Sequence, residues 1–237
     1  MDAEAALPSR GLLVLCVLLG VLILGWLTWR DFRSRRLLRE APLPTINKQP
    51  VVLANRTFDP ATPPTDMPPL ASGENAECDS NFLSSASVRG ESRQTDATHA
   101  TVTIVKIKVT LQLNISIWVP TGVTQHVIEH EEGHRQISEY YYQTADKLAE
   151  RIAATYLGKQ VEIDGTDLDA ESSKMLQQMA ADFTDEYNKE LNPGPTQLLY
   201  DAITDHGRNE VVAKDAVTHA LKNIAIESTQ PRRNPEN

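Results

Sequence analysis

The segment HVIEHEEGHRQISEYYYQ, residues 126–143, contains two histidines four positions apart, and a glutamate directly follows the first of them. On a helix, His130 and His134 lie one turn apart, so both imidazoles point the same way and can occupy two tetrahedral positions around one zinc ion. Glu131 is rotated by about 100° from His130, which brings its carboxylate beside the metal as a base for water. The H-E-x-x-H pattern therefore predicts a catalytic zinc site. The alternative is a pair of solvated histidines on a charged helix.

A catalytic zinc ion needs a third protein ligand, and distance excludes most of the nearby candidates. Asp146 and Glu150 lie on the same predicted helix, roughly 18 and 24 Å beyond His134 at about 1.5 Å per residue. His126 shares the helix face, but three imidazoles in line over roughly 12 Å cannot converge on one ion. The third ligand must therefore come from another segment. The remaining candidates are His99, Asp182, Glu186, His206 and His219.

Two separated motifs, HEEGHRQISEYYYQ and the downstream YDAITDHGRN, resemble those of the predicted secreted zinc-dependent proteases of bacteria. Members of that family pair an H-E-x-G-H-x-x-I helix with a downstream Y-D-x-x-T-x-H-G, and a strand ending in proline precedes the helix. The resemblance spans roughly residues 75–222 and implies a zincin-like fold and a zinc-dependent peptidase. The matching residues are Pro120, His130, Glu131, Gly133, His134, Ile137, Tyr200, Asp201, Thr204, His206 and Gly207.

The second of these motifs supplies a candidate for the missing ligand. His206 stands beside a glycine that would end a helix, so it can reach the histidine pair, and we expect it to be the third ligand. Asp201 or Asp205 would then orient an imidazole from behind, and Tyr200 would donate a hydrogen bond to the oxyanion that develops during hydrolysis. The alternatives are a helix cap or surface position for each aspartate and a packed core position for Tyr200.

Two periodicities place these residues in an α+β domain. Every odd position from Ile107 to Ile117 is apolar and every even position from Lys106 to Ser116 is polar, which predicts a half-buried strand or a hairpin. Helical periods follow at about residues 124–157, 175–187, 196–205 and 212–224. We therefore predict a small antiparallel sheet packed on a zincin-like H-E-x-x-H helix and further helices. If an edge of the alternating strand is open, an extended peptide could pair with it.

The segment GLLVLCVLLGVLILGWLTW, residues 11–29, carries no charge and no proline. As a helix it would extend about 28 Å, enough to cross a bilayer, so we predict one N-terminal transmembrane helix. A cleaved signal peptide is the alternative, but no small-x-small cleavage site follows. The expected organisation is a tail over 1–10, the anchor over 11–29, a basic flank and Pro-rich linker over 30–74, the metalloprotease domain over 75–227 and a disordered tail over 228–237. Parts of the linker could instead pack on the domain.

The charge distribution bears on partners and on location. The formal net charge of −9 leaves no basic face of the kind that nucleic acids require, so we exclude them as partners. Five arginines within residues 30–39 follow the anchor, and the positive-inside rule would keep the domain in the cytoplasm. The resemblance to exported proteins and the spacer favour the other side. We expect a single-pass membrane protein with an extracytoplasmic domain.

The expected function is zinc-dependent hydrolysis of peptide bonds in a peptide or protein substrate. His130, His134 and His206 would hold Zn²⁺, and Glu131 would activate water and then protonate the leaving amine. The alternative is a non-catalytic, membrane-tethered binding or assembly module in which the same histidines hold a structural zinc ion. Glu131 distinguishes the two, because a structural site has no use for an acid there.

Overall fold

The computed structural model describes residues 43–70 and 73–229, with side chains as far as Asn223. These residues belong to one compact unit. The predicted N-terminal tail and anchor, residues 30–42 of the predicted basic flank, and residues 230–237 of the predicted disordered tail lie outside the described residues. Within the part of the chain that the structure describes, no helix combines the length and apolar character needed to cross a bilayer.

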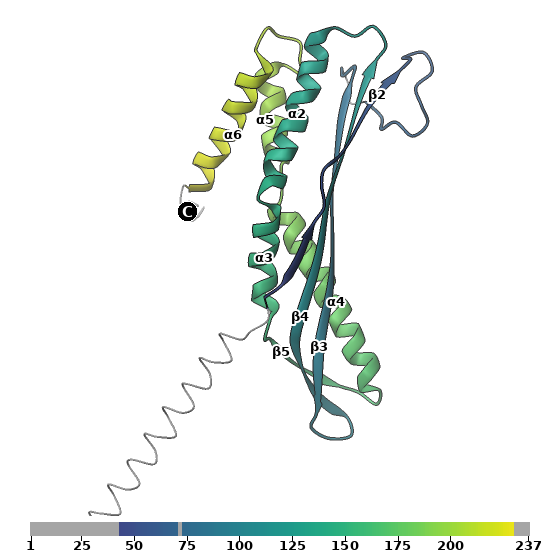
Figure 1. Ribbon diagram of the computed structural model, residues 1–237, viewed down its shortest axis with the longest axis vertical. Helices are drawn as coiled ribbons and strands as arrows, with labels where there is room; N and C mark the ends of the chain where they lie inside the picture. The colour runs from purple at the N-terminus through teal and green to yellow at the C-terminus, as the bar shows by residue number, and fades with distance from the viewer. Residues whose placement is uncertain (1–42, 71–72, 230–237) are drawn as a thin grey trace, which may run out of the picture. The chain divides into compact units, whose positions relative to one another are not determined.

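A five-stranded mixed sheet is built around one long strand, β4 (His99–Pro120). β3 (Glu77–Gln94) pairs antiparallel with β4 along one edge and forms a long hairpin with it (Figure 1). Three short strands share the other edge of β4 in succession. They are β5 (Gln160–Asp164), which is antiparallel, and β1 (Thr45–Lys48) and β2 (Val52–Phe58), which are both parallel.

The alternation predicted for β4 is confirmed. The odd positions from Ile107 to Ile117 are all buried, and they contact α2, α3 and α4 in one apolar cluster. Lys106, Lys108 and Thr110 point to the opposite face of the sheet and are exposed. The two-residue period of a strand thus separates a helix-covered face from a solvent face.

The prediction of an antiparallel sheet is confirmed in part: β3 and β5 pair antiparallel with β4, whereas β1 and β2 run parallel to it. Both strands lie within residues 30–74, the segment expected to be a linker, so part of that segment packs on the domain instead. Their sequences carry little strand signal, since β2 reads VLANRTF and buries only Phe58. Such strands are held by backbone pairing with β4, which no side-chain period reveals.

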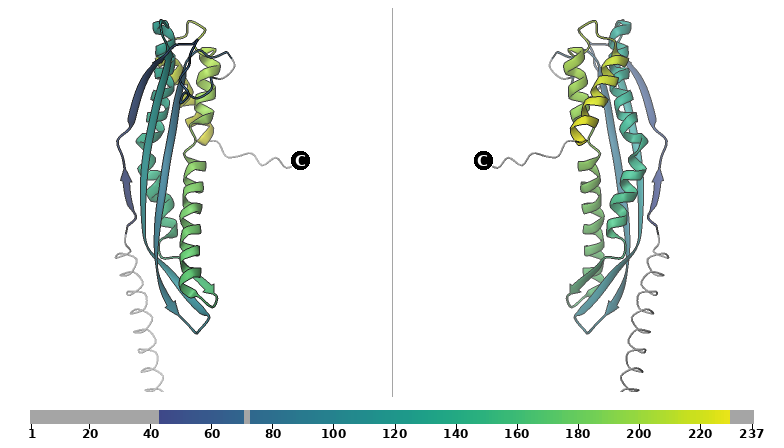
Figure 2. Two further views of the ribbon diagram at one scale, coloured as in Figure 1. Left: turned by 90° about the vertical axis from the view of Figure 1, so that its right-hand side faces the viewer. Right: turned by 90° about the vertical axis from the view of Figure 1, so that its left-hand side faces the viewer.

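Five helices occur among the described residues, and three of them pack along the sheet (Figure 2). The helix predicted over residues 124–157 is two helices, α2 (Gln125–Gln143) and α3 (Ala145–Tyr156), interrupted at Thr144. Lys48 of β1 stabilises the junction between the two helices, because its Nζ donates hydrogen bonds to the carbonyl oxygen of Gln143 (2.8 Å) and to Asp146 (3.1 Å). The other helices are α4 (Leu168–Glu190), α5 (Gly194–Thr204) and α6 (Ala213–Thr229).

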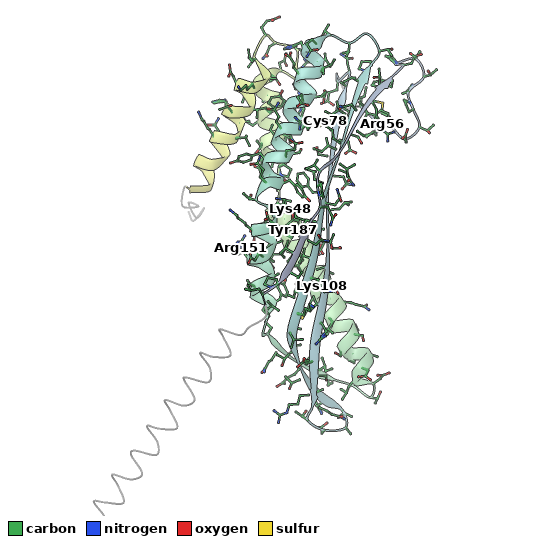
Figure 3. All side chains as sticks on the ribbon, viewed as in Figure 1. Lys48, Arg56, Cys78, Lys108, Arg151 and Tyr187 are labelled. Atoms are coloured by element: carbon green, nitrogen blue, oxygen red, sulfur yellow. The ribbon has the colours of Figure 1, made fainter. Side chains whose placement is uncertain are left out.

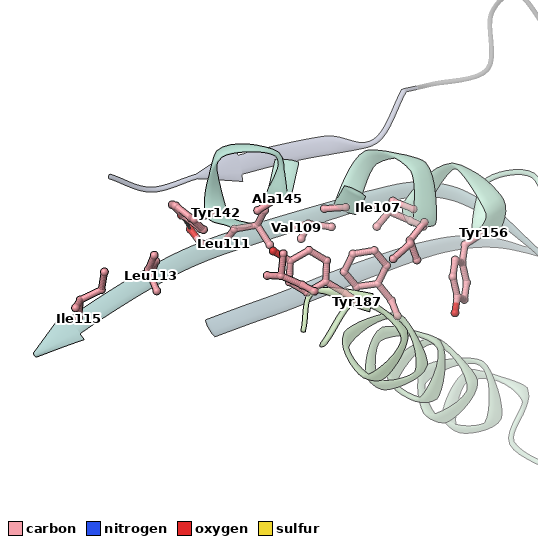
Figure 4. Close-up of a cluster of buried hydrophobic side chains, with 14 of the residues drawn as sticks. Ile107, Val109, Leu111, Leu113, Ile115, Tyr142, Ala145, Tyr156 and Tyr187 are labelled. Carbon is pink, nitrogen blue, oxygen red and sulfur yellow. Dashed lines mark hydrogen bonds between the residues drawn. The ribbon is translucent and has the colours of Figure 1, made fainter. Parts of the chain in front are cut away.

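The main apolar core lies between β4, α3 and α4 (Figure 4). Phe183 and Tyr187 of α4 are 0% and 1% exposed, and their rings stack with a centroid separation of 6.2 Å. The ring of Tyr156 meets that of Phe183 edge to face at 6.4 Å. Burial of such large rings contributes most of the stability that a core of this size provides.

A second apolar cluster joins α2, α5 and α6. Its buried members are Ile137, Tyr200, Ala216, Val217 and Ala220. Because Ile137 follows His134 on α2 and Tyr200 precedes Asp201 on α5, this cluster fixes the histidine-bearing helix against the next helix that carries a candidate ligand.

Candidate metal centre

Two imidazoles and one carboxylate converge where α2 faces α5. Nε2 of His130 lies 3.2 Å from Nε2 of His134. Oδ1 of Asp201 lies 3.4 Å from the first of these nitrogens and 2.9 Å from the second. The three ligand atoms all fall within 4.8 Å of one another, so this group could hold a metal ion.

The glycine inside H-E-x-G-H allows α5 to approach α2 closely. A Cβ atom at Gly133 would lie 2.1 Å from the hydroxyl oxygen of Tyr200. That hydroxyl donates a hydrogen bond to the carbonyl oxygen of His130 (3.0 Å), and the Tyr200 ring stacks on the His130 ring at a centroid distance of 5.1 Å. Tyr200 therefore holds His130 in place, and Asp201 follows it directly into the site.

The turn after α5 closes against the same histidine. Asp205, His206 and Gly207 all have positive φ, at 49°, 54° and 69°. Such left-handed backbone is costly for residues other than glycine, so a run of three marks a chain reversal held by its surroundings. At Gly207 a Cβ atom would lie 2.9 Å from Cγ of His130, so the backbone of the turn packs directly on the imidazole.

The charged groups at the site shift one another's pKa values. Burial alone would raise the pKa of the Asp201 carboxyl, but close contact with His130 and His134 outweighs it and holds that pKa below its usual value. Burial likewise lowers the pKa of His134, and the contact with Asp201 reverses that shift and raises it. Oδ1 of Asp201 is buried and lacks an aligned hydrogen-bond donor among the described residues. An oxygen in this state has lone pairs free for a cation.

Glu131 lies beside this group and is 5% exposed. Burial raises the pKa of its carboxyl to about 7, and nearby Glu77 and Glu74 add to the shift, while His134 opposes it. A carboxyl with a pKa near neutrality can both accept and return a proton, which is what general acid–base catalysis requires.

A cleft of about 300 Å³ opens onto the histidines, with the beginning of β3 on one side and α2 and α5 on the other. β3 contributes Glu77, Cys78, Asp79 and Ser80 to this cleft, and Figure 3 marks Cys78 at the α2 side of the sheet. Burial, with a smaller contribution from the charge of Glu131, raises the pKa of the Cys78 thiol to about 12. The thiol is therefore protonated and inert near neutral pH.

Gln197 is a site residue that the sequence analysis missed. Its Nε2 donates to the carbonyl oxygen of His134 (3.1 Å) and to the hydroxyl of Ser138 (3.0 Å). Its Oε1 therefore faces Nδ1 of His134, which donates to it at 2.6 Å. With the proton on Nδ1, the neutral imidazole presents the lone pair of Nε2 to the site. The available signal was the spacing, since residues 197 and 201 lie one turn apart on α5.

The structure places the other predicted residues of the second motif around this group. His206, expected to be the third ligand, has a side chain that is 43% exposed, and its Nδ1 lies 3.4 Å from Oε1 of Glu74 and 4.0 Å from Oδ1 of Asp201. Asp201, expected behind an imidazole, is the residue grouped with the two histidines. Asp205 points away and pairs with Arg208 at 2.8 Å.

Tyr200, expected to be an oxyanion donor, is 0% exposed, and its hydroxyl donates a hydrogen bond to the backbone of α2. It does not line the cleft. Its contacts are those of a residue that positions His130.

The remaining ligand candidates make contacts of their own away from the site. His99 is hydrogen bonded to Asp96 at 2.8 Å, near the β3–β4 turn. His219 lies near Asn223 on α6, Asp182 accepts from Gln178, and Glu186 accepts from Tyr156. Among the described residues, none of these four joins the metal-ligating group.

The hypothesis that a peptide pairs with an open edge of the alternating strand is wrong for β4. Ile115, for example, faces Leu53 of β2 on one side and Ser80 of β3 on the other. The free edge near the site belongs to β3, which pairs only with β4 among the described strands. Its first residues are those that line the cleft.

Comparison of this chain with protein-family models, with curated proteins and with solved structures gives no match.

Proposed function

We propose that this chain is a zinc-dependent metallopeptidase. The observation that carries the proposal is the convergence of His130, His134 and Asp201 beside a buried glutamate, Glu131. Two imidazoles and one carboxylate are a donor set of catalytic zinc sites, which keep a position open for water or substrate. The same donor set also suits iron(II) in oxygenases. Glu131, directly beside it with a pKa near neutrality, favours hydrolysis and hence zinc.

The residues fit a zinc ion, because their ligand atoms are of the right type and have free lone pairs. Both facing nitrogens are Nε2 atoms, and Gln197 fixes the tautomer of His134 that leaves this nitrogen free. Oδ1 of Asp201 is buried without an aligned hydrogen-bond donor from the part of the chain that the structure describes. When bound here, zinc would supply Lewis-acid chemistry that acidifies water and polarises a carbonyl group. Nδ1 of His206 lies 4.0 Å from Oδ1 of Asp201, so His206 stays a candidate for an additional ligand.

The side chains then divide the work of hydrolysis between them. Glu131 accepts the proton of the attacking water and passes it to the amine that leaves. Asp201 would offset part of the positive charge of the bound ion, because histidines that hold a metal are neutral. Tyr200 and Gln197 keep His130 and His134 in the orientation that the ligand set needs.

The free edge of β3 offers a path for the substrate. A peptide in extended conformation could form backbone hydrogen bonds with residues 77–80 and would then pass directly over the histidines. We also propose that residues 11–29 anchor the chain in a membrane with this domain on the extracytoplasmic side. A reporter enzyme fused after residue 237, active only on one side of the membrane, tests that orientation.

The test of the proposed function compares the wild-type protein with Glu131→Gln, each after loading with zinc. We expect both to bind zinc, and we expect hydrolysis of an unfolded protein substrate by the wild type to fall by about 10²–10⁴-fold in the variant. Equal zinc binding with no hydrolysis by either protein would support the non-catalytic binding or assembly module instead. Full activity in Glu131→Gln would overturn the mechanism.

A further inference from the structure

An apolar cavity of about 670 Å³ lies at the end of the sheet, next to the N-terminus of α2. One wall is the connection from β2 to β3, which contributes Met67 and Leu70. The other wall is the β4–α2 turn, which contributes Val123 and Val127. Phe58, only 4% exposed, also lines it. None of the lining residues carries a charge, and the volume falls within the range of about 300–1,000 Å³ typical of ligand pockets.

The walls of this apolar cavity are held in shape. Five of the lining residues are prolines, which fix the backbone φ angle and reduce the entropy lost when a ligand binds. The backbone N–H of Thr121 donates to the carbonyl oxygen of Phe58 (2.8 Å) and ties the β4–α2 turn to the end of β2. Arg56 pairs with Asp66 at 2.8 Å and fastens the β2–β3 connection. The cavity is therefore formed before any ligand arrives.

The apolar cavity and the metal centre are neighbours along α2. A smaller hollow of about 90 Å³ shares Asn75 and Val127 with the apolar cavity. The same hollow shares His130 and Glu131 with the cleft over the histidines. Since residue 127 precedes residue 131 by one turn of α2, the three hollows follow one another along the helix.

We propose that the apolar cavity is a specificity site, which receives apolar side chains of the peptide substrate on one side of the bond to be cleaved. This inference rests on the proposed function. A smaller hollow between the cavity and the cleft shares lining residues with both, which argues for a segment of the same peptide that crosses the metal centre. The lack of charge in the lining argues for apolar side chains. The cavity is large enough for more than one of them. Substrates would then be cleaved beside short apolar runs, such as those that unfolded proteins expose.

The experiment uses the full-length chain in lipid nanodiscs, because free detergent would compete for an apolar cavity. Zinc-loaded protein is given a set of quenched fluorescent peptides that carry either apolar residues or Gly and Ser at each position. Cleavage sites are located by mass spectrometry, and kcat/KM is measured for each peptide. The wild type is expected to prefer apolar residues on one side of the cleaved bond by about tenfold or more.

Val123→Trp places an indole ring in the cavity from the β4–α2 turn, where Val123 is partly exposed, and so fills part of it. The matched control is Val212→Trp, at a valine that is 61% exposed and lines none of the three hollows. The first variant should show a weaker preference for apolar over Gly- and Ser-containing peptides, and the control should show the preference of the wild type. Met67→Trp fills the same cavity from the opposite wall and replaces Val123→Trp should that protein not fold. An apolar preference unchanged in the filled variant, or absent from the wild type, overturns the inference.

A binding measurement separates this inference from the proposed function. A fluorescent apolar peptide is titrated into Glu131→Gln protein with and without Val123→Trp, and its anisotropy reports binding without turnover. Binding that weakens by about tenfold in the double variant supports the cavity assignment even if no protein hydrolyses peptides. Equal binding overturns it even if hydrolysis is observed. A nanodisc lipid found bound to the wild type and displaced by Val123→Trp would also overturn the assignment to peptide.

Discussion

The two halves of the described domain differ in what they bury. The aromatic core between β4, α3 and α4 buries aliphatic and aromatic side chains such as Phe183 and Tyr187. The metal-site half, formed by α2, α5 and the beginning of β3, buries polar groups. All five polar or charged residues that the described domain buries lie on α2 or α5, and they are His130, Glu131, Ser138, Thr196 and Thr204. The aromatic core supplies stability. In the metal-site half, Ser138, Thr196 and Thr204 have hydrogen-bond partners within the domain. Glu131 and Oδ1 of Asp201 are instead desolvated groups that a ligand or a reaction would use.

The largest stability effect should come from the aromatic core. Phe183→Ala removes a ring that is 0% exposed and contacts two other aromatic rings. We expect a loss of about 3–5 kcal/mol in the free energy of unfolding, measured by urea denaturation. Zinc affinity of the protein that remains folded should not change, because no ligand contacts this ring. A comparable fall in zinc affinity would show that the two halves are not separable.

The metal-site half should instead make the free energy of unfolding depend on pH. The pKa of Glu131 is raised from 4.5 to about 7 in the metal-free folded protein, so the folded state holds a proton that the unfolded chain releases. The stability from this proton is fully present below pH 4.5 and is lost as the pH rises through about 7. Across that window the wild type should lose a few kcal/mol relative to Glu131→Gln, in which the other titrating groups are the same. If the free energy of unfolding of the two proteins, measured in chelator, changes with pH in parallel, the pKa of Glu131 is not raised by burial.

Gln197→Ala should weaken zinc binding by about 10–100-fold, because the variant leaves the tautomer and ring orientation of His134 unfixed. Isothermal titration calorimetry with zinc measures the effect. Gln178→Ala is the matched control, since Gln178 is an exposed glutamine on α4 whose side chain donates a hydrogen bond to Asp182. The same zinc affinity in both variants would mean that Gln197 does not position the ligand.

Tyr200→Phe should have the smallest effect, at about 1 kcal/mol of stability, because it removes one hydrogen bond and keeps the stacked ring. If Tyr200 only positions His130, the fold decrease in kcat should be no larger than the fold change in KM or in zinc affinity. A loss of kcat by about 10² or more with unchanged zinc affinity would return Tyr200 to the role of an oxyanion donor.

The elements that sequence reasoning predicted well are those with a strong local period. The alternation in β4 and the one-turn spacing of His130 and His134 depend only on neighbours along the chain, and both are present in the structure. β1 and β2 were expected within a linker because their pairing partner, β4, lies far away in sequence. A short strand with one buried side chain leaves no periodic trace.

The third member of the metal-ligating group could not be read from the motif alone. Asp201 and His206 both belong to Y-D-x-x-T-x-H-G, and which of them faces the histidines depends on where α5 ends. Because α5 continues to Thr204, the carboxylate of Asp201 lies on the helix surface that meets α2, and the left-handed turn carries His206 toward Glu74. In that turn the backbone of Gly207 packs on His130, which is a tertiary contact.

The zinc content of the purified full-length protein tests most directly whether α2 and α5 assemble a metal site. The wild type, Asp201→Ala, His206→Ala and the matched control Asp205→Ala are dialysed side by side against buffer with limiting zinc and measured by mass spectrometry of the metal. The arrangement of His130, His134 and Asp201 predicts one zinc ion per chain in the wild type and in Asp205→Ala, and about a tenth of that or less in Asp201→Ala. Full zinc content in Asp201→Ala, with loss only in His206→Ala, would contradict the ligand group described for these helices.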